Sequence, residues 1–187
     1  MVIMEKWMAD GPAQEKVEDT LLNDAGVKML NKNRRGRGGG VALLFEHANM
    51  NFKEYRLKTK SHEIIAAKGP IPCSGRSLYV FGIYVKPSMS ALRKAEMLEL
   101  IMDEVISIKA REKDPALCIA GDFNGLSAQP FTDAFNTLIT LNSPPTRRGA
   151  ALDLVVSNFQ EQMTDIFTAP CLTSDDGAES DHDVLAV

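Results

Sequence analysis

The stretch ALCIAGDFNG, from Ala116 to Gly125, gives the clearest indication of how the chain folds. It begins with an apolar run typical of a buried strand, and Gly121 ends that run. Asp122 and Asn124 follow two residues apart, and alternate residues of an extended chain point to the same side. The stretch therefore predicts either a polar turn or one corner of an active site, where a carboxylate and an amide face the same ligand.

The segments around this stretch change from strand periodicity to helix periodicity and back. From Ala91 to about Arg111 the apolar residues have helical spacing, with Ser90 as a cap and a proline beyond the end. A shorter helix is expected near 127–138, and residues 13–30 are expected to be loop with some helix. A basic, glycine-rich loop follows at 31–40. Strands are expected at 2–4, 41–46, 52–59, 63–68, 77–85, 116–120, 151–157, 163–168 and 183–187.

This order of elements predicts an α/β sandwich of two mixed β-sheets flanked by helices, formed by one domain over residues 1–187. The strands between 41 and 85 are expected to form a meander. A chain of 187 residues with 44% hydrophobic and 25% charged residues is ordinary for a globular protein with a real core.

Charge and cysteine content limit the possible functions. The net charge of −4 excludes a global attraction to nucleic acid or to an anionic membrane, so binding of a polyanion would need a local basic patch. Three widely separated cysteines argue against a disulfide framework and a zinc site, and Cys118 is expected to be a small buried hydrophobe. Neither a signal peptide nor a membrane-spanning run is present, so an intracellular location is expected.

Two further polar positions are candidates for chemistry. Ser180, Asp181 and His182 directly precede the last apolar strand; histidine can bind or protonate a phosphate oxygen, and Asp181 can ligate Mg²⁺. An acidic, solvated turn is the alternative. Asp153 lies within a run of leucine and valine, where a carboxylate needs a partner, and His182 is the obvious candidate. A water-facing aspartate on a strand edge is the alternative there.

Basic residues gather in two places. Lys32, Arg34, Arg35 and Arg37 lie in the glycine-rich segment, and Arg147 with Arg148 is a second pair. Together they predict a positive patch that contacts a phosphate backbone, although a solvated loop is the alternative for each single residue. His47 and His62 have no motif around them and are expected to be structural.

Several segments occur in an order that resembles the endonuclease/exonuclease/phosphatase superfamily. They are GGGVALLF at 38–45, GIYVKPS at 82–88, GDFN at 121–124, ALDLVV at 151–156 and SDHDVLAV at 180–187. RGRGGGVALLF at 35–45 and PTRRG at 145–149 are most similar to the apurinic-type endonuclease domain of non-LTR (LINE-type) retrotransposons. The resemblance extends from Val2 to Val187 and implies a DNase I-like fold.

The resemblance also implies a role for each site residue. Glu5 and Asp181 would bind the metal ion, and Tyr84 would contact the scissile phosphate. Asp122 would position the attacking water, and Asn124 would position the phosphate. The remaining implied site residues are Asp153 to orient the histidine, His182 to bind the phosphate, and Ser180, Thr146, Arg147, Arg35 and Arg37 on the substrate side.

The implied activity is Mg²⁺-dependent hydrolysis of a phosphodiester bond in DNA, with Mn²⁺ as a possible substitute. The nicked strand would keep a 3′-hydroxyl that primes reverse transcription, so DNA and a reverse transcriptase domain are the implied partners, with no membrane, and the nucleus is the implied place of action. The alternatives are a catalytically impaired remnant, and a phosphatase or phospholipid phosphodiesterase of the same superfamily.

Two departures from the family pattern are visible. The chain begins after the family's first strand and helix, so the domain is expected to be N-terminally truncated and to lack an active-site asparagine. Only six residues separate Thr146 from Asp153, where related enzymes usually have a longer hairpin that helps to choose the target. Altered target selection is therefore expected.

Overall fold

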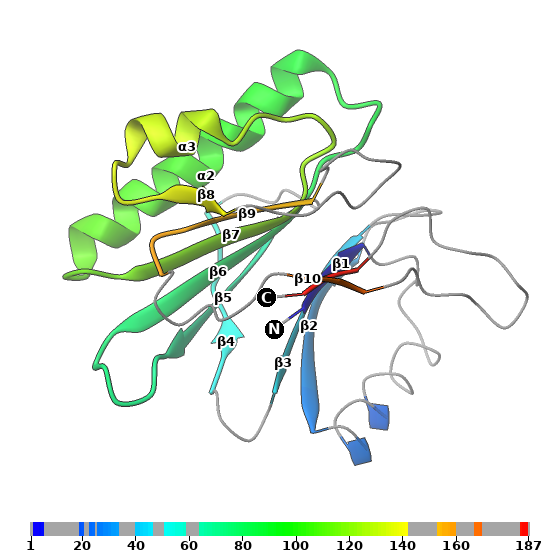
Figure 1. Ribbon diagram of the computed structural model, residues 1–187, viewed down its shortest axis with the longest axis vertical. Coiled ribbons are helices and arrows are strands. Elements are labelled where there is room, and N and C mark those ends of the chain that lie inside the picture. Colours follow the sequence, from blue (N-terminus) through cyan, green and yellow to red (C-terminus); the bar gives the residue numbers. More distant parts are fainter. Residues whose placement is uncertain are drawn as a thin grey trace, which may run out of the picture.

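Two β-sheets lie face to face, and two helices cover the outer face of the larger sheet (Figure 1). The computed structural model describes residues 2–5, 19–20, 23–24, 26–33, 40–46, 51–58, 64–141, 153–159, 167–169 and 184–186. No helix in these ranges is both long enough and apolar enough to cross a membrane.

The smaller sheet has the strand order β10-β11-β1-β3-β2. All its described pairs are antiparallel. Its strands are β1 (Val2–Glu5), β2 (Val27–Asn33), β3 (Gly40–Glu46), β10 (Phe167–Ala169) and β11 (Val184–Ala186).

The larger sheet has the strand order β4-β5-β6-β7-β9-β8 and is mixed, because β6 and β7 are parallel while its other pairs are antiparallel. Its strands are β4 (Lys53–Glu54), β5 (Ile64–Pro70), β6 (Ser77–Tyr84), β7 (Ala116–Asp122), β8 (Ile139–Leu141) and β9 (Asp153–Ser157). The predicted sandwich is therefore present, but among the described strand pairs only the larger sheet is mixed, whereas two mixed sheets were predicted.

Helix α2 (Ala91–Arg111) is the crossover that makes β6 and β7 parallel. Its bounds are those predicted, and the Ser90 side chain accepts the Arg93 N–H at 3.4 Å as the cap. Helix α3 (Gln129–Ala134) is shorter than the predicted 127–138. Both helices pack on the same face of the larger sheet, so β7 is buried on both faces.

Alternate residues of β7 contribute to two different cores. Leu117 and Ile119 pack toward the helices, whereas Ala116, Cys118 and Ala120 belong to the core between the sheets. Complete burial raises the pKa of the Cys118 thiol to about 12, which makes it the inert hydrophobe expected. The same alternation puts the side chain of Asp122, two residues after Ala120, on the face between the sheets.

The strand assignment differs from the prediction in four places. Strand β2 covers the end of the segment expected to be loop with some helix and the first residues of the predicted glycine-rich loop, and it is stabilised by pairing residue by residue with β3. The expected meander is divided: β3 belongs to the smaller sheet, and only β4, β5 and β6 are consecutive neighbours. Strand β4 is shorter than the strand predicted at 52–59, and strand β8 was not predicted. Of the strand predicted at 163–168, the structure describes only residues 167–168, which belong to β10.

Helix α2 is held to the larger sheet by polar contacts as well as apolar ones. Glu104 is 3% exposed, and its carboxylate accepts the Tyr55 hydroxyl at 3.1 Å and the Lys58 N–H at 3.0 Å. At the C-terminal end of the helix, Glu112 accepts from Lys68 Nζ and from the Tyr79 hydroxyl, each at 2.5 Å. These two acidic side chains tie the helix to the segment after β4, to β5 and to β6.

The Glu112 contacts predict a pH window for stability. Burial acts to raise the pKa of Glu112, but the bonds from Lys68 and Tyr79 outweigh it and lower this pKa below 4.5. The bond to Glu112 raises the pKa of Lys68 above 10.5, and burial raises the pKa of Tyr79 above 10.0. Glu112 therefore contributes to the stability of the fold above pH 4.5, and this contribution is lost as the pH falls through its folded pKa. Lys68 and Tyr79 contribute to stability at lower pH, and their contributions are lost as the pH rises above about 10.

We expect Glu112→Gln to lower the free energy of unfolding at neutral pH by about 1 kcal/mol, since the pair is partly exposed. The variant should also lose less stability on acidification than wild type. Urea denaturation at several pH values measures both effects. Glu99→Gln, an exposed position on the same helix, is the control, and equal acid sensitivity of Glu112→Gln and wild type would contradict the assignment.

Candidate active site

Three of the predicted site residues form one row across neighbouring strands. Tyr84 at the end of β6 pairs with Asp122 at the end of β7, and Asp122 pairs with Asp153 at the start of β9. Directly paired residues of adjacent strands place their side chains on the same face of a sheet. The fold therefore brings together three residues that are 38 and 31 positions apart in the sequence (122 − 84 and 153 − 122).

The row faces the space between the two sheets. Two residues back along the strands, Ala120 and Val155 belong to the core between the sheets, and Tyr84 packs against that core. Asp122 is 8% exposed, whereas Tyr84 and Asp153 are half-buried. The side chains of the row thus lie where the core between the sheets ends.

Asp122 and Asn124 form one rigid unit. Both carboxylate oxygens of Asp122 accept from Asn124, Oδ1 from the backbone N–H at 2.9 Å and Oδ2 from the side-chain Nδ2 at 2.6 Å. Nδ2 also donates to the Val85 carbonyl at 2.7 Å. The left-handed φ of +41° at Asn124 makes this geometry possible, and asparagine tolerates that conformation better than most residues.

The glycine before Asp122 allows β6 and β7 to approach closely. Gly121 has φ +140°, and a Cβ atom there would lie 2.0 Å from the carbonyl oxygen of Ile83. Just past the strands, the Val85 N–H donates to the Asp122 carbonyl at 2.8 Å. The close approach at Gly121 and the bond at Val85 together set the position of Asp122 relative to Tyr84.

Lys94 contacts the turn that follows Asp122, and sequence reasoning missed this contact. From the first turns of α2 its Nζ donates to the Asn124 carbonyl at 3.2 Å, which ties the helix to the turn after β7. The basic side chain on an amphipathic helix gives no sequence signal for this contact, because its partner is a backbone atom 30 residues away.

The smaller sheet brings the end of β1 to the same end of the sandwich. Glu5 is the last residue of β1 and pairs with Val41 of β3. The Val41 side chain lies 3.2 Å from the position of a Cβ on Gly82, two residues before Tyr84. Strand β1 also lies opposite β7, so the strand position of the predicted metal ligand is close to the row.

The remaining predicted site residues lie outside the described part of the chain, so their roles remain predictions. They are Arg35, Arg37, Thr146, Arg147, Ser180, Asp181 and His182, and the same holds for Arg34, Arg148, His47 and His62. Among the residues that are described, no three His, Cys, Asp or Glu side chains group closely enough to hold a metal ion.

The charge of the row is compatible with a hard cation beside it. Asp122 and Asp153 are carboxylates directly opposite each other on paired strands, so they bring negative charge to this end of the sandwich. Carboxylate oxygens are the ligands that Mg²⁺ prefers. The strand position of Glu5 is close to this charge, which fits a divalent cation held next to a base.

Comparison with solved structures identifies the fold. The endonuclease domain of TRAS1, a telomere-specific non-LTR retrotransposon, has 16% sequence identity and a TM-score of 0.60 over 86% of this chain and 78% of that one. A humanized TDP2 of D. rerio has 13% identity and a TM-score of 0.65, over 98% and 82%. The catalytic domain of human Nocturnin, with a bound sulfate anion, has 17% identity and a TM-score of 0.56, over 89% and 73%.

No sequence-family profile and no curated protein matches the chain. The solved structures therefore show the fold, which is the DNase I-like fold of endonuclease/exonuclease/phosphatase proteins. This confirms, at the level of the fold, the resemblance that the sequence motifs indicated.

Proposed function

We propose that this chain, with its endonuclease/exonuclease/phosphatase fold, hydrolyses phosphodiester bonds in DNA and leaves a 3′-hydroxyl on the nicked strand. The observation that carries the proposal is the row of Tyr84, Asp122 and Asp153 at one end of the sandwich, with Asn124 bonded to both oxygens of Asp122. These residues come from the same motifs that carry the sequence resemblance.

Asp122 is the group that accepts the proton of the attacking water. A base must be held in one orientation to be effective, and the two bonds from Asn124 do this. Both N–H groups of the Asn124 side chain are engaged, one by Asp122 and one by the Val85 carbonyl. Asn124 therefore acts as a positioning residue in this arrangement, and contact with a phosphate oxygen would require it to exchange one of these bonds.

The other residues bind and orient the substrate. Tyr84 lies beside Asp122 and can donate its hydroxyl to the scissile phosphate. Asp153, the neighbour of Asp122 on the other side, orients His182, which binds a non-bridging oxygen. Glu5 and Asp181 would hold Mg²⁺ or Mn²⁺, which supplies positive charge next to the charge that develops on the leaving oxygen.

The cellular role that we propose is that of a retroelement endonuclease domain. It would act in the nucleus beside a reverse transcriptase domain, which extends the 3′-hydroxyl. The likeness to the TRAS1 endonuclease domain and the segments 35–45 and 145–149 support this role. The matches to TDP2 and to Nocturnin at comparable scores support the alternative of another phosphodiesterase or a phosphatase of the same fold.

A substrate comparison tests the proposal. We expect nicking of supercoiled plasmid DNA in Mg²⁺, loss of nicking in EDTA, and a nicked product that a DNA polymerase can extend. Inositol phosphates and sphingomyelin should not be turned over at a comparable rate. Nicking that is equal in wild type and His182→Ala, or turnover confined to the small substrates, would contradict the assignment; folded protein without any turnover would indicate an impaired remnant.

A further inference from the structure

A pocket opens between the edge strands of the two sheets, at the end of the sandwich where the Tyr84 row lies. It is lined by Lys32, Glu54, Tyr55, Arg56, Leu57, Ile64, Ile65 and Ala66. We propose that it binds one phosphate–sugar unit of the DNA strand whose phosphodiester is cleaved at Asp122. This inference rests on the proposed function and adds a binding subsite to it.

Strand register places the pocket beside the row. Strand β5 begins at Ile64, which pairs with Ile83, the residue before Tyr84. In the other sheet Lys32 pairs with Val41, which itself pairs with Glu5. The pocket is therefore one or two strand spacings, about 5–10 Å, from Tyr84, a distance that roughly two or three nucleotides of one strand span.

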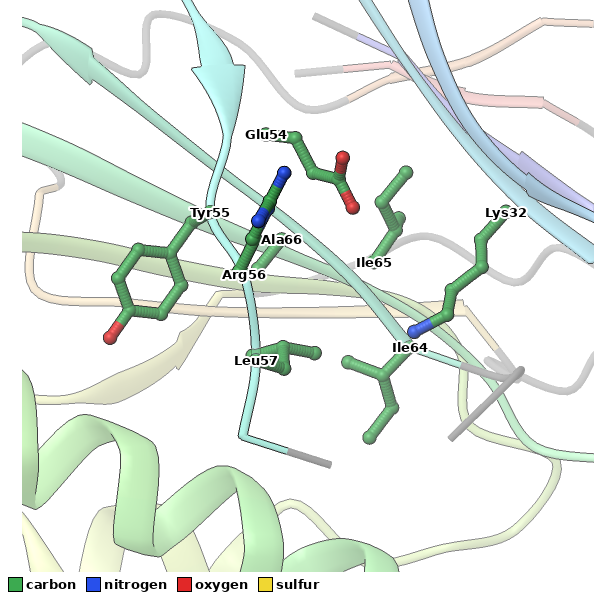
Figure 2. Close-up of a pocket in the computed structure, with 8 residues that line it drawn as sticks. All are labelled: Lys32, Glu54, Tyr55, Arg56, Leu57, Ile64, Ile65 and Ala66. Atoms are coloured by element: carbon green, nitrogen blue, oxygen red, sulfur yellow. The ribbon is translucent and has the colours of Figure 1, made fainter. Parts of the chain in front are cut away.

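Arg56 lies on the same face of the larger sheet as the row. Along this segment Phe52 is buried in the core between the sheets, and residues two and four positions later share its side of the extended chain. Tyr55 instead points to the helix side, where its hydroxyl bonds Glu104. Figure 2 shows Glu54 and Arg56 on the pocket side, with Lys32 reaching from β2 toward Ile64 and the Tyr55 ring turned away.

The polar groups of the pocket are suited to a nucleotide backbone. Arg56 makes neither a hydrogen bond nor an ion pair with another residue in the described ranges, so its guanidinium is available to a ligand. Lys32 adds a second positive charge on the opposite wall. Glu54 faces the same pocket, and its carboxylate repels a phosphate bound there.

The size of the pocket limits the ligand. Its volume is about 210 Å³, which is equivalent to roughly seven water molecules. Independent ligand sites usually measure about 300–1,000 Å³. Ile64, Ile65 and Ala66 are almost completely buried and expose little apolar surface. The pocket is therefore small and polar, which suits one unit of a longer chain better than a free molecule.

Charged residues on edge strands have another explanation, because they also prevent sheets from pairing edge to edge. A positive and a negative side chain prevent such pairing equally well. In a phosphate site, by contrast, removing a positive charge should weaken DNA binding and removing a negative charge should strengthen it. The signs of the responses at Arg56 and Glu54 therefore separate the two explanations.

The test measures binding of a fluorescein-labelled DNA duplex by anisotropy, in EDTA so that no cleavage occurs. We expect Arg56→Gln to raise Kd by about three- to tenfold and to reduce the salt dependence of log K by about one unit. Glu54→Gln should lower Kd by about two- to threefold, because it removes a repulsive charge. Lys113→Gln and Glu99→Gln make the same changes of net charge at exposed positions outside the pocket, and we expect neither to alter Kd.

Two results would overturn the subsite: equal effects of Arg56→Gln and Lys113→Gln, or weaker binding by Glu54→Gln. Thermal melting confirms that these surface variants are folded. Nicking of plasmid DNA by the wild-type protein is measured separately. If the wild type does not nick DNA, but Arg56→Gln and Glu54→Gln change Kd in opposite directions, only the proposed function is rejected. Normal nicking without those responses would reject the subsite alone.

Discussion

Replacing Asp122 by asparagine is expected to lower the rate of DNA nicking by about 10²- to 10⁴-fold, the usual contribution of a general base. Asparagine can still accept the Asn124 N–H that now bonds Oδ1, at 2.9 Å. It cannot take a proton from water, and its amide would face the Nδ2 of Asn124, which now donates to Oδ2 at 2.6 Å. The substitution therefore removes the base and disturbs its support.

Stability has to be measured together with activity for this variant. Two amide donors that face each other in a buried position cost about 1–3 kcal/mol, and urea denaturation will show this loss. Nicking is then compared at a temperature where both proteins are folded. Asp103→Asn, an exposed aspartate on α2, should leave nicking unchanged. Folded Asp122→Asn protein with nearly normal nicking would rule out Asp122 as the base.

The residues of the row could be predicted one by one, but their alignment could not. Both signals are local: the motif around Asp122 predicts polar residues at the end of a strand, and the carboxylate of Asp153 within an apolar run predicts a group that needs a partner. The alignment of Tyr84, Asp122 and Asp153 depends on strand register, which long-range packing determines. A one-residue shift of β9 would have turned Asp153 toward the helices.

The parts that the sequence did not reveal depend on contacts between distant segments. Residues 52–59 carry apolar side chains on both sides of the chain: Phe52 packs between the sheets, while Tyr55 and Leu57 pack toward the helices. Both faces of this edge segment are partly apolar, so periodicity alone cannot choose between them. The position of Arg56 beside the pocket follows only from the observed pairing of β4 with β5.

Gly121→Ala is expected to be among the most destabilising single changes to the larger sheet. A Cβ atom at this position would lie 2.0 Å from the Ile83 carbonyl oxygen, and 3.0 Å from the Ile83 N and carbonyl carbon. These are backbone atoms of the neighbouring strand, so no side-chain rotation can relieve the clash. We expect a loss of at least about 3 kcal/mol in the free energy of unfolding, measured by urea denaturation.

Gly125→Ala is the matched control, because Gly125 also has a positive φ, +75°, but nothing lies within 4 Å of its Cβ position. Its cost should be only the backbone strain of about 1–2 kcal/mol. The difference between the two variants thus measures the close approach of β6 and β7. Any Gly121→Ala protein that folds should also nick DNA about 10²-fold more slowly, since the clash displaces Asp122 from Tyr84. Equal stabilities of the two variants would show that the sheet can separate at this point, and the site would then not depend on the contact between Gly121 and Ile83.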